Sequence, residues 1–325
     1  MLFGLGATKA GTSWLWQYLR AHPECHIRTI KELHFFDTIE ADRIPARVAE
    51  LRRRRDALRA QDAAGDLKGP RKLTDMTAWV EVMDSADPQE YLAFLTHRLR
   101  DKKLVADITP AYATLPVPRL RQMAALSPRS RFVYLMRDPL SRLWSHVRMI
   151  ARRTTEDEAR LPDAAHALLG RVVAGQEPSI ASRSDYAAVL SRLGEAVAPS
   201  RVFSAFFEDM LSGEGLIDRL CRFLGIAPHT PPPWKSVCTK ASGYRSTRTM
   251  RAPRCAGSSR NIPPYRPAWA AFPASGKPTS RGFRDDGWIE LQRYADRRTE
   301  DPQLQHQFRA ATPCGTWCFA PGARA

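Results

Sequence analysis

The chain has 325 residues, of which 43% are hydrophobic and 26% are charged, a composition that suits a globular protein with a sizeable core and excludes a disordered chain. Its formal net charge of +16 indicates an acidic partner, which leaves nucleic acid, an anionic membrane surface and an acidic small molecule as classes. No stretch approaches the ~18 apolar residues that a membrane span needs, so the sequence argues against a membrane-spanning helix.

The first predicted element is a strand over residues 2–5, followed by a glycine-bearing loop and a helix over residues 12–21. Such a turn aims unpaired backbone N–H groups and the positive end of the helix dipole at one point, so the loop is predicted to bind an anion. Residues 1–6 lack the basic region and long apolar segment of a signal peptide, and we expect a cytoplasmic protein.

The lysine of this loop is displaced from the place it has in nucleoside triphosphatases. Their loop carries lysine directly after the second glycine and a hydroxyl for Mg²⁺ next to it. Here Thr12 follows Gly11, and the lysine lies inside the loop as Lys9. ATP chemistry uses lysine and magnesium together, whereas a phosphosulfate has less terminal charge and can be held without a metal. The loop therefore favours a phosphosulfate over the runner-up, a P-loop nucleotide kinase.

Downstream, short apolar runs alternate with longer helical patterns, which predicts a doubly wound α/β fold: a P-loop-like parallel sheet covered by helices on both faces. The basic run Arg52–Arg55, between Glu50 and Asp56, is interpreted as a solvated helix face. The further predicted strands are 104–108, 131–136 and 201–206, and the further predicted helices are 44–60, 88–99, 139–153, 184–196 and 216–224.

A second candidate site follows the strand 131–136. Arg137 stands at its carboxyl end, Pro139 begins a helix, and Ser145 lies about two turns into that helix. Ligands of open α/β sheets bind at the carboxyl ends of strands, so we expect Arg137 on the same rim as Lys9.

The chain changes character after residue 245. Prolines interrupt every period, and arginines and small residues fill the gaps. We therefore divide the chain into a nucleotide-binding domain at 1–245 and an irregular Pro/Arg-rich extension at 246–325 of unknown role. The six cysteines include no C-x-x-C pair and are predicted to be reduced thiols rather than a disulfide framework or a zinc site.

These motifs together resemble a known family. Residues 6–13 resemble the 5′-phosphosulfate loop of sulfotransferases that use 3′-phosphoadenosine 5′-phosphosulfate (PAPS), and Arg137 with Ser145 resembles their 3′-phosphate motif. Residues 31–37 resemble the Glu-x-His-Phe-Phe segment of the heparan sulfate group within that family. The resemblance spans roughly residues 2–225, and it implies sulfuryl transfer from PAPS, without a required metal, to a hydroxyl or amine of a small molecule or carbohydrate.

The resemblance also implies roles for individual residues. Lys9 would stabilise charge on the bridging oxygen, and Arg137 and Ser145 would bind the 3′-phosphate. Glu32 lies at the position of the catalytic base in the heparan group, and His34 is the rival base, because imidazole commonly serves near neutral pH and the cytosolic branch of the family uses a histidine. In an alternating strand over residues 32–36 the two would share a face, so position alone does not choose. The residues implied to bind the phosphosulfate are Lys9, Ala10, Gly11, Thr12 and Ser13.

Two further segments resemble the family less closely. Residues 107–112 resemble a Glu-Lys-Ser/Thr-Pro-Ala-Tyr segment of the heparan group, but Ile108 replaces its lysine, which argues against a polyanionic acceptor. Residues 239–245 are a candidate for the basic loop that closes over the nucleotide, which makes Lys240 and Arg245 candidate donor-binding residues.

Other functions remain open at this point. An inactive relative would bind nucleotide without chemistry. A nucleic-acid-binding protein would interleave basic residues with exposed aromatics, whereas most aromatics here lie in predicted core elements, so no specific nucleic acid is expected. The acceptor and the oligomeric state do not follow from the sequence.

Overall fold

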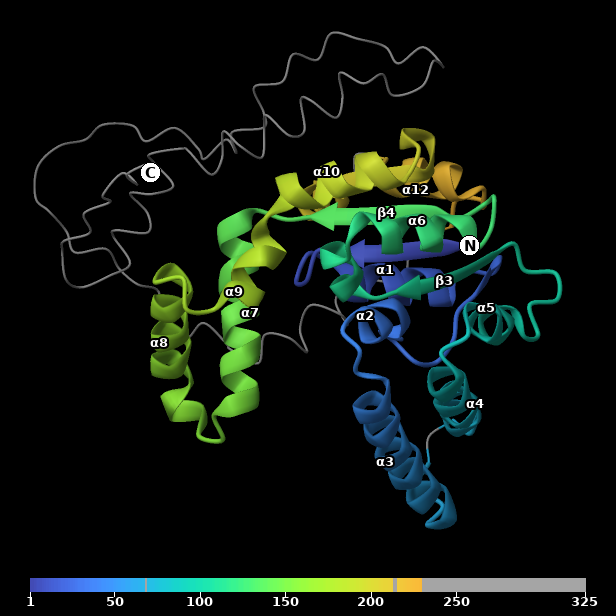
Figure 1. Ribbon diagram of the computed structural model, residues 1–325, viewed down its shortest axis with the longest axis horizontal. Coiled ribbons are helices and arrows are strands. Elements are labelled where there is room, and N and C mark those ends of the chain that lie inside the picture. The colour runs from blue at the N-terminus through green and yellow to red at the C-terminus, as the bar shows by residue number, and fades with distance from the viewer. Residues whose placement is uncertain (68, 213–214, 230–325) are drawn as a thin grey trace, which may run out of the picture.

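The computed structural model describes residues 1–67, 69–212 and 215–229. Its five strands form one sheet in the order β2-β3-β1-β4-β5, and every neighbouring pair is parallel. This confirms the predicted α/β class (Figure 1). The strands are β1 (Leu2–Gly6), β2 (Cys25–His26), β3 (Leu104–Ile108), β4 (Arg131–Met136) and β5 (Val202–Phe206).

The central strand β1 is buried along its whole length, as expected for a parallel strand with helices on both faces. Phe3 faces Asp107 on β3 and Phe132 on β4, and the Phe3 and Phe132 rings stack with centroids 5.2 Å apart. Gly4 is required by its neighbour, because a Cβ there would lie 2.6 Å from Cδ1 of Ile108. The glycine lets β3 approach β1 closely.

Helices cover the two faces of the sheet in a doubly wound pattern. Right-handed crossovers place α1 on one face, and α6 and α10, which pack on each other, on the other. The Tyr18 hydroxyl of α1 lies 3.1 Å from Sγ of Cys221 on α12, so α12 covers the same face as α1. The helices are α1 (Thr12–Ala21), α2 (Phe35–Glu40), α3 (Ile44–Ala63), α4 (Arg71–Ser85), α5 (Pro88–Thr96), α6 (Val117–Ala125), α7 (Pro139–Thr154), α8 (Leu161–Val173), α9 (Pro178–Ala181), α10 (Tyr186–Ala196), α11 (Phe207–Ser212) and α12 (Leu216–Leu224), with 3₁₀ turns η1 (Pro110–Thr114), η2 (Glu158–Arg160), η3 (Ser182–Ser184) and η4 (Pro199–Arg201).

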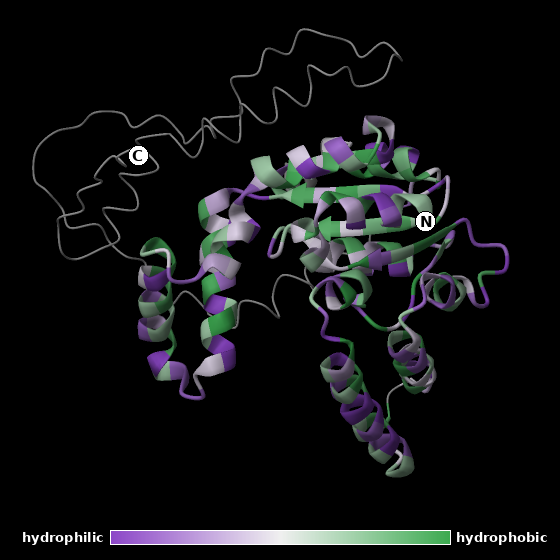
Figure 2. Ribbon diagram, viewed as in Figure 1, coloured by the Kyte–Doolittle hydropathy of each residue, from purple (hydrophilic) through white to green (hydrophobic). Residues whose placement is uncertain are grey.

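Two helical pairs, α3–α4 and α7–α8, extend from the sheet in the same direction (Figure 1). The α7–α8 pair has its own small apolar cluster, centred on Val147, Ala165 and Leu168. Helix α3 is mostly hydrophilic on its outer surface (Figure 2), where Arg54 pairs with Glu50 and Arg52 pairs with Asp84 of α4. The basic run is thus a solvated helix face, as predicted.

The predicted strands and most predicted helices are confirmed within a few residues at their ends. The prediction that a helix begins at 184 is wrong by two residues, because Asp185 caps the backbone N–H of Ala188 and α10 starts at Tyr186. Strand β2 and helices α2, α4, α6, α8, α9 and α11 were not predicted.

Within the described ranges, no helix is long and apolar enough to cross a membrane. Cys25 and Cys221 are buried free thiols. The other four cysteines and the predicted extension at 246–325 lie outside the described residues.

Candidate functional site

The candidate site lies where the strand order reverses. The chain runs from β1 toward β2 on one side of the sheet and from β4 toward β5 on the other, and at such a switch point open α/β sheets bind ligands in a crevice at the carboxyl ends of the strands, here β1 and β4. The Arg137 side chain, after β4, donates through Nη1 to the Lys9 carbonyl, after β1, at 3.4 Å. The fold therefore brings together the two cationic positions that are 128 residues apart in sequence.

The loop after β1 presents backbone donors toward this crevice. Gly11 stands at the N-cap of α1 with φ 90°, a left-handed conformation that glycine adopts without strain, and it has no side chain to occupy the first-turn N–H groups. Lys9 also has a positive φ of 70°. Lys9 is half-buried, Thr12 is buried and Ser13 is exposed. No side chain of the described residues caps the first turn of α1, a geometry that suits an anion on the side of Ser13.

Cations surround Lys9. Burial lowers the pKa of its ammonium group, and Arg137, Lys31, Arg153 and Arg148 lower it further. No carboxylate forms an ion pair with Lys9 in the part of the chain that the structure describes. A group of like charges destabilises itself unless an anion binds among them, so the electrostatics select a negatively charged ligand.

The backbone around Arg137 is held from two sides. The Tyr186 hydroxyl donates to the Arg137 carbonyl at 2.8 Å, and Oε1 of Glu208 accepts the N–H of Asp138 at 3.0 Å. The Arg137 guanidinium lies over the Phe207 ring, with its carbon 5.6 Å from the centroid. These contacts fix the end of β4 and aim the guanidinium back toward the loop.

Ser145 lies on helix α7, and no hydrogen bond joins it to Lys9 or Arg137 among the described residues. Asp138 caps the helix by accepting the N–H of Ser141 at 2.8 Å, and Ser145 is half-buried about two turns from Arg137. Its neighbour His146 is buried, and burial, with Arg142 and Arg183 next, lowers its pKa to about 4. His146 is therefore neutral at physiological pH.

The segment that contains Glu32 and His34 is not the alternating strand that the sequence predicted. Both residues have left-handed backbone conformations, with φ 61° and 58°, and α2 begins at Phe35. The physical reason is that consecutive Phe35 and Phe36 are both fully buried, whereas an alternating strand would expose one of them. Phe35 stacks on Tyr91 with centroids 4.6 Å apart.

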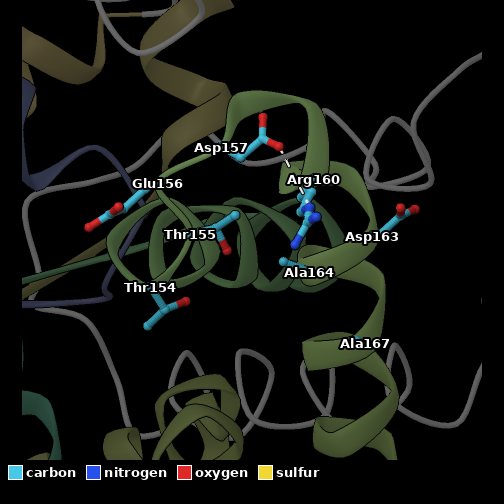
Figure 3. A pocket seen from close by; sticks show the side chains of 8 residues that line it. All are labelled: Thr154, Thr155, Glu156, Asp157, Arg160, Asp163, Ala164 and Ala167. Carbon is cyan, nitrogen blue, oxygen red and sulfur yellow. Dashed lines mark ion pairs between the residues drawn. The ribbon is translucent and has the colours of Figure 1, made fainter.

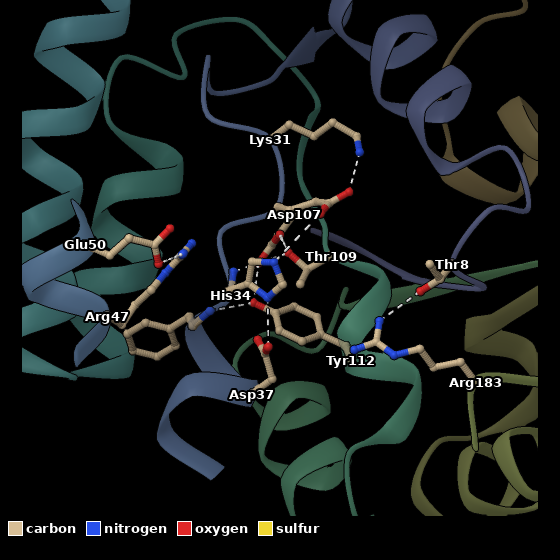
Figure 4. A network of polar contacts seen from close by, with 12 residues as sticks. Thr8, Lys31, His34, Asp37, Arg47, Glu50, Asp107, Thr109, Tyr112 and Arg183 are labelled. Carbon is tan, nitrogen blue, oxygen red and sulfur yellow. Dashed lines mark hydrogen bonds and ion pairs between the residues drawn. The ribbon is translucent and has the colours of Figure 1, made fainter. Parts of the chain in front are cut away.

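Glu32 and His34 nevertheless lie together, with Nε2 of His34 3.8 Å from Oε2 of Glu32. Nδ1 of His34 lies 2.8 Å from Oδ2 of Asp37 (Figure 4), and Lys31 forms an ion pair with Glu32. Burial lowers the pKa of His34, but the hydrogen bond to Asp37 and the nearby carboxylate of Glu32 outweigh it and raise the pKa to about 9. Burial raises the pKa of Glu32, but His34 and Lys31 outweigh it and lower the pKa to about 2. At neutral pH the pair is a carboxylate beside an imidazolium.

A buried carboxylate supports this pair from behind. Asp107 accepts hydrogen bonds from the hydroxyls of Tyr91 at 2.9 Å, Thr109 at 2.6 Å and Tyr112 at 2.7 Å. The Tyr112 hydroxyl in turn accepts the N–H of Phe35 at 3.0 Å (Figure 4). Burial raises the pKa of Asp107, and the three hydroxyls oppose that rise. The network anchors the start of α2, and with it His34.

The residue at the family's lysine position does not line the site. Ile108 is 1% exposed and packs against Gly4 inside the sheet. Lys240 and Arg245, predicted to close over the nucleotide, lie outside the described residues.

Four residues that contact the candidate site were not predicted from the sequence. Lys31 and Asp37 flank the Glu32–His34 pair, and Arg142 and Arg183 contact Thr8 in the loop. Lys31 and Asp37 lie within the segment 31–37 that resembles the family, so their positions beside Glu32 and His34 were an available signal. Arg142 gave none, because a helical arginine is usually solvated.

A hollow of about 720 Å³ lies at the outer end of the α7–α8 pair (Figure 3). Its wall includes Glu156, Asp157, Arg160 and Asp163, and none of the predicted site residues. Its carboxylates outnumber its one basic residue, so it does not suit an anionic nucleotide.

The profile described as "Sulfotransferase family" matches residues 2–231. Among solved structures, a sulfotransferase from Alicyclobacillus acidocaldarius is 22% identical, with a TM-score of 0.48, over 71% of this chain and 83% of that chain. The sulfotransferase domain from the Synechococcus PCC 7002 olefin synthase is 19% identical, with a TM-score of 0.45, over 71% of this chain and 78% of that chain. No curated protein matches the sequence.

Proposed function

Because the chain belongs to the sulfotransferase family, we propose that it transfers a sulfuryl group from PAPS to a hydroxyl or amine of an acceptor. The observation that carries the proposal is the meeting of Lys9 and Arg137 at the crevice between β1 and β4, where neither forms an ion pair with a carboxylate of the described residues. Two cations held beside a helix N-terminus provide binding for two separate anionic groups of one nucleotide.

The donor would be held at its two anionic ends. On this proposal Lys9 and the backbone N–H groups of residues 10–13 bind the 5′-phosphosulfate, with the hydroxyls of Thr12 and Ser13 nearby. Arg137 and Ser145 bind the 3′-phosphate, and Lys240 and Arg245 complete the nucleotide site. Lys9 then neutralises the charge that grows on the bridging oxygen as the sulfuryl group leaves.

Proton transfer on the acceptor side is assigned to Glu32. The acceptor oxygen or nitrogen attacks sulfur in line with the bridging oxygen, the S–O bond to the phosphate breaks, and the acceptor proton passes to the Glu32 carboxylate. The contacts with Asp37 and Glu32 raise the pKa of His34 to about 9, which argues against His34 as the base at neutral pH. Asp37 and Glu32 on its two ring nitrogens give it the role of holding the carboxylate in place.

The acceptor class follows from the same segment. Residues 31–37 support an acceptor of the carbohydrate kind, as in the heparan group, but Ile108 leaves the acceptor side without the cation of that group. A neutral hydroxyl or amine, as on an unsulfated carbohydrate or a small molecule, fits this arrangement better than a polyanion.

Thermal denaturation with nucleotides tests the donor. PAPS without Mg²⁺ should raise the melting temperature, because a ligand of the native state stabilises it by mass action, and Mg²⁺-ATP should do so weakly. Mass spectrometry of a carbohydrate or metabolite extract incubated with the protein and PAPS then identifies the acceptor by its sulfuryl mass increment. A response to Mg²⁺-ATP that equals or exceeds the response to PAPS would favour a nucleotide kinase instead.

A further inference from the structure

Thr8, in the loop after β1, is contacted by two arginines from distant parts of the chain. Nη1 of Arg183 donates to the Thr8 hydroxyl at 3.0 Å, although 175 residues separate them in sequence (Figure 4). Nη1 of Arg142, on α7, donates to the Thr8 carbonyl at 3.4 Å. The position of the loop thus depends on side chains that sequence neighbours do not supply.

Neither arginine forms an ion pair with a carboxylate among the residues described. Arg142 is fully buried, its Nη2 donates to the Ser184 hydroxyl, and its Nε has no partner. Moving a guanidinium out of water is costly unless negative charge compensates it, and a carbonyl and a hydroxyl are neutral acceptors. The positive charges of Arg142 and Arg183 beside the loop therefore favour binding of an anion that does not belong to the chain.

The two arginines differ in what they can reach. Arg142 is 0% exposed, so it acts only on its protein neighbours, Thr8 and Ser184. Arg183 is half-buried, and Thr8 takes one of the five N–H donors that a guanidinium offers. Its other donors have no partner within the described ranges and are available to a ligand.

Residues 183–186 also join the two parts of the site. Arg183 contacts the loop after β1, Ser184 is held by Arg142, and the Tyr186 hydroxyl donates to the carbonyl of Arg137 after β4. Arg183 therefore lies on the side of the phosphosulfate loop, whereas Tyr186 lies on the side of the 3′-phosphate candidate.

We propose that Arg183 is a donor-binding residue that contacts the 5′-phosphate of the phosphosulfate, with Thr8 and Arg142 fixing its direction. This assignment rests on the proposed function, since it takes the nucleotide to be PAPS. On this assignment two cations, Lys9 in the loop and Arg183, bind the 5′ end of the donor. Arg137 binds the 3′ end.

Calorimetric titration of Arg183→Gln with four adenine nucleotides tests the assignment. A guanidinium hydrogen bond to phosphate is charge-assisted, so the variant should bind PAPS, adenosine 5′-phosphosulfate and adenosine 3′,5′-bisphosphate roughly 10- to 150-fold more weakly. Adenosine 3′-phosphate lacks the 5′-phosphate and should bind as it does to the wild type. Arg183→Lys keeps the charge and should recover part of the affinity.

Arg201→Gln is the matched control. Arg201 is a half-buried arginine just before β5 that donates to the backbone carbonyls of Ser130, Ala124 and Ser127, at the amino ends of the strands and thus opposite the candidate site. The control should bind all four nucleotides like the wild type. Thr8→Val removes only the hydroxyl that Arg183 contacts, and should lower affinity for the same three nucleotides by a smaller factor than Arg183→Gln does.

The outcomes separate this inference from the function on which it rests. If Arg183→Gln binds adenosine 5′-phosphosulfate as tightly as the wild type does, or loses as much affinity for adenosine 3′-phosphate, the assignment to the 5′ end is wrong. If the wild type binds none of the four nucleotides, the proposed function itself fails.

Discussion

The charges of Glu32 and His34 decide which of them can act as a base. Their side chains lie 3.8 Å apart, and each stabilises the charged form of the other. A base must be unprotonated at the working pH, and with a pKa of about 2 Glu32 meets that condition where His34, with a pKa of about 9, does not.

The pH dependence of kcat/KM should reveal the base. With Glu32 as base, kcat/KM should be flat between about pH 5.5 and 8 and should fall above about pH 9, where His34 loses the proton that holds the carboxylate. With His34 as base the sign reverses, and kcat/KM should rise about tenfold for each pH unit up to about 9. Steady-state rates across this range distinguish the two profiles.

Substitutions at the pair provide an independent test. Glu32→Gln should lower kcat by about 10²- to 10⁴-fold, the usual contribution of a positioned base, and should leave PAPS affinity almost unchanged. His34→Ala should cost less, because it removes only a group that positions the carboxylate. If His34→Ala is inactive and Glu32→Gln is active, His34 is the base and the assignment is reversed.

Arg137 and Ser145 are tested by discrimination between nucleotides. Arg137→Ala should weaken PAPS binding roughly 10- to 150-fold, and Ser145→Ala about fivefold, because the serine supplies a neutral hydrogen bond. Adenosine 5′-phosphosulfate has no 3′-phosphate and should bind both variants as it binds the wild type. Isothermal titration of each single variant and the double variant measures this, and equal losses for both nucleotides would make Arg137 a structural arginine.

At the scale of elements, helix α4 positions the segment that leads to Glu32. Asp75 of α4 forms a buried ion pair with Arg28 at 3.0 Å, and its other oxygen accepts hydrogen bonds from the backbone N–H and hydroxyl of Thr29 at 2.9 and 2.7 Å. Arg28 also donates to the Phe94 carbonyl through Nε at 2.7 Å. The segment before Glu32 is thus tied to two helices.

Asp75→Ala should therefore destabilise the protein by about 3 to 5 kcal/mol, because it leaves the Arg28 guanidinium buried without its partner. The control Asp84→Ala breaks the exposed pair with Arg52 and should cost about 1 kcal/mol or less. Urea denaturation of both variants gives the two values. Equal and small losses would show that α4 does not anchor this segment.

The sequence allowed the elements that carry strong local signals to be predicted. Strands β3 and β4 are apolar runs, and α1 and α7 begin after a glycine turn and at a proline, so their positions followed directly. Strand β2 has only Cys25 and His26, which is too short for any period to appear. The turn at Glu32 was missed because burial of Phe35 and Phe36 depends on Tyr91 and Tyr112, which come from later elements.

The candidate site was predictable to the same degree. Lys9 and Arg137 follow strands, and parallel strands share a rim, so their proximity could be inferred. The contact of Arg183 with Thr8 could not be inferred, because it depends on how α7, α9 and η3 fold back over 175 residues of chain. The charge states of Glu32 and His34 also required the contacts with Lys31 and Asp37.

At the scale of the whole molecule, the end of the described region is anchored to the sheet. The Tyr18 hydroxyl donates to the His229 carbonyl at 3.1 Å, Nε2 of His22 lies 2.8 Å from the Ala227 carbonyl, and Glu24 accepts the N–H of Ala227 at 2.6 Å. These contacts join the segment after α12 to α1 and to the residues before β2, so all five strands are in place before residue 230.

Removal of residues 251–325 should accordingly leave a folded protein that binds PAPS, since Lys240 and Arg245 remain. Removal of residues 230–325 should also leave a folded protein, but with weaker PAPS binding. Circular dichroism and calorimetry on the two truncated chains measure both properties. If the protein that ends at residue 250 aggregates or loses helical signal, the extension completes the core.

The sheet order has a consequence for the time at which the site forms during synthesis. Strand β1 is synthesised before both of its partners, β3 and β4, which come about a hundred or more residues later. Such distant contacts form slowly, because a long loop must close before the pairing repays its entropy. The contact between Thr8 and Arg183 forms later still, after Arg183 has been synthesised. A growing chain therefore carries β1 as an unpaired apolar strand until β3 and β4 have been made, and the candidate site is complete only after residue 183.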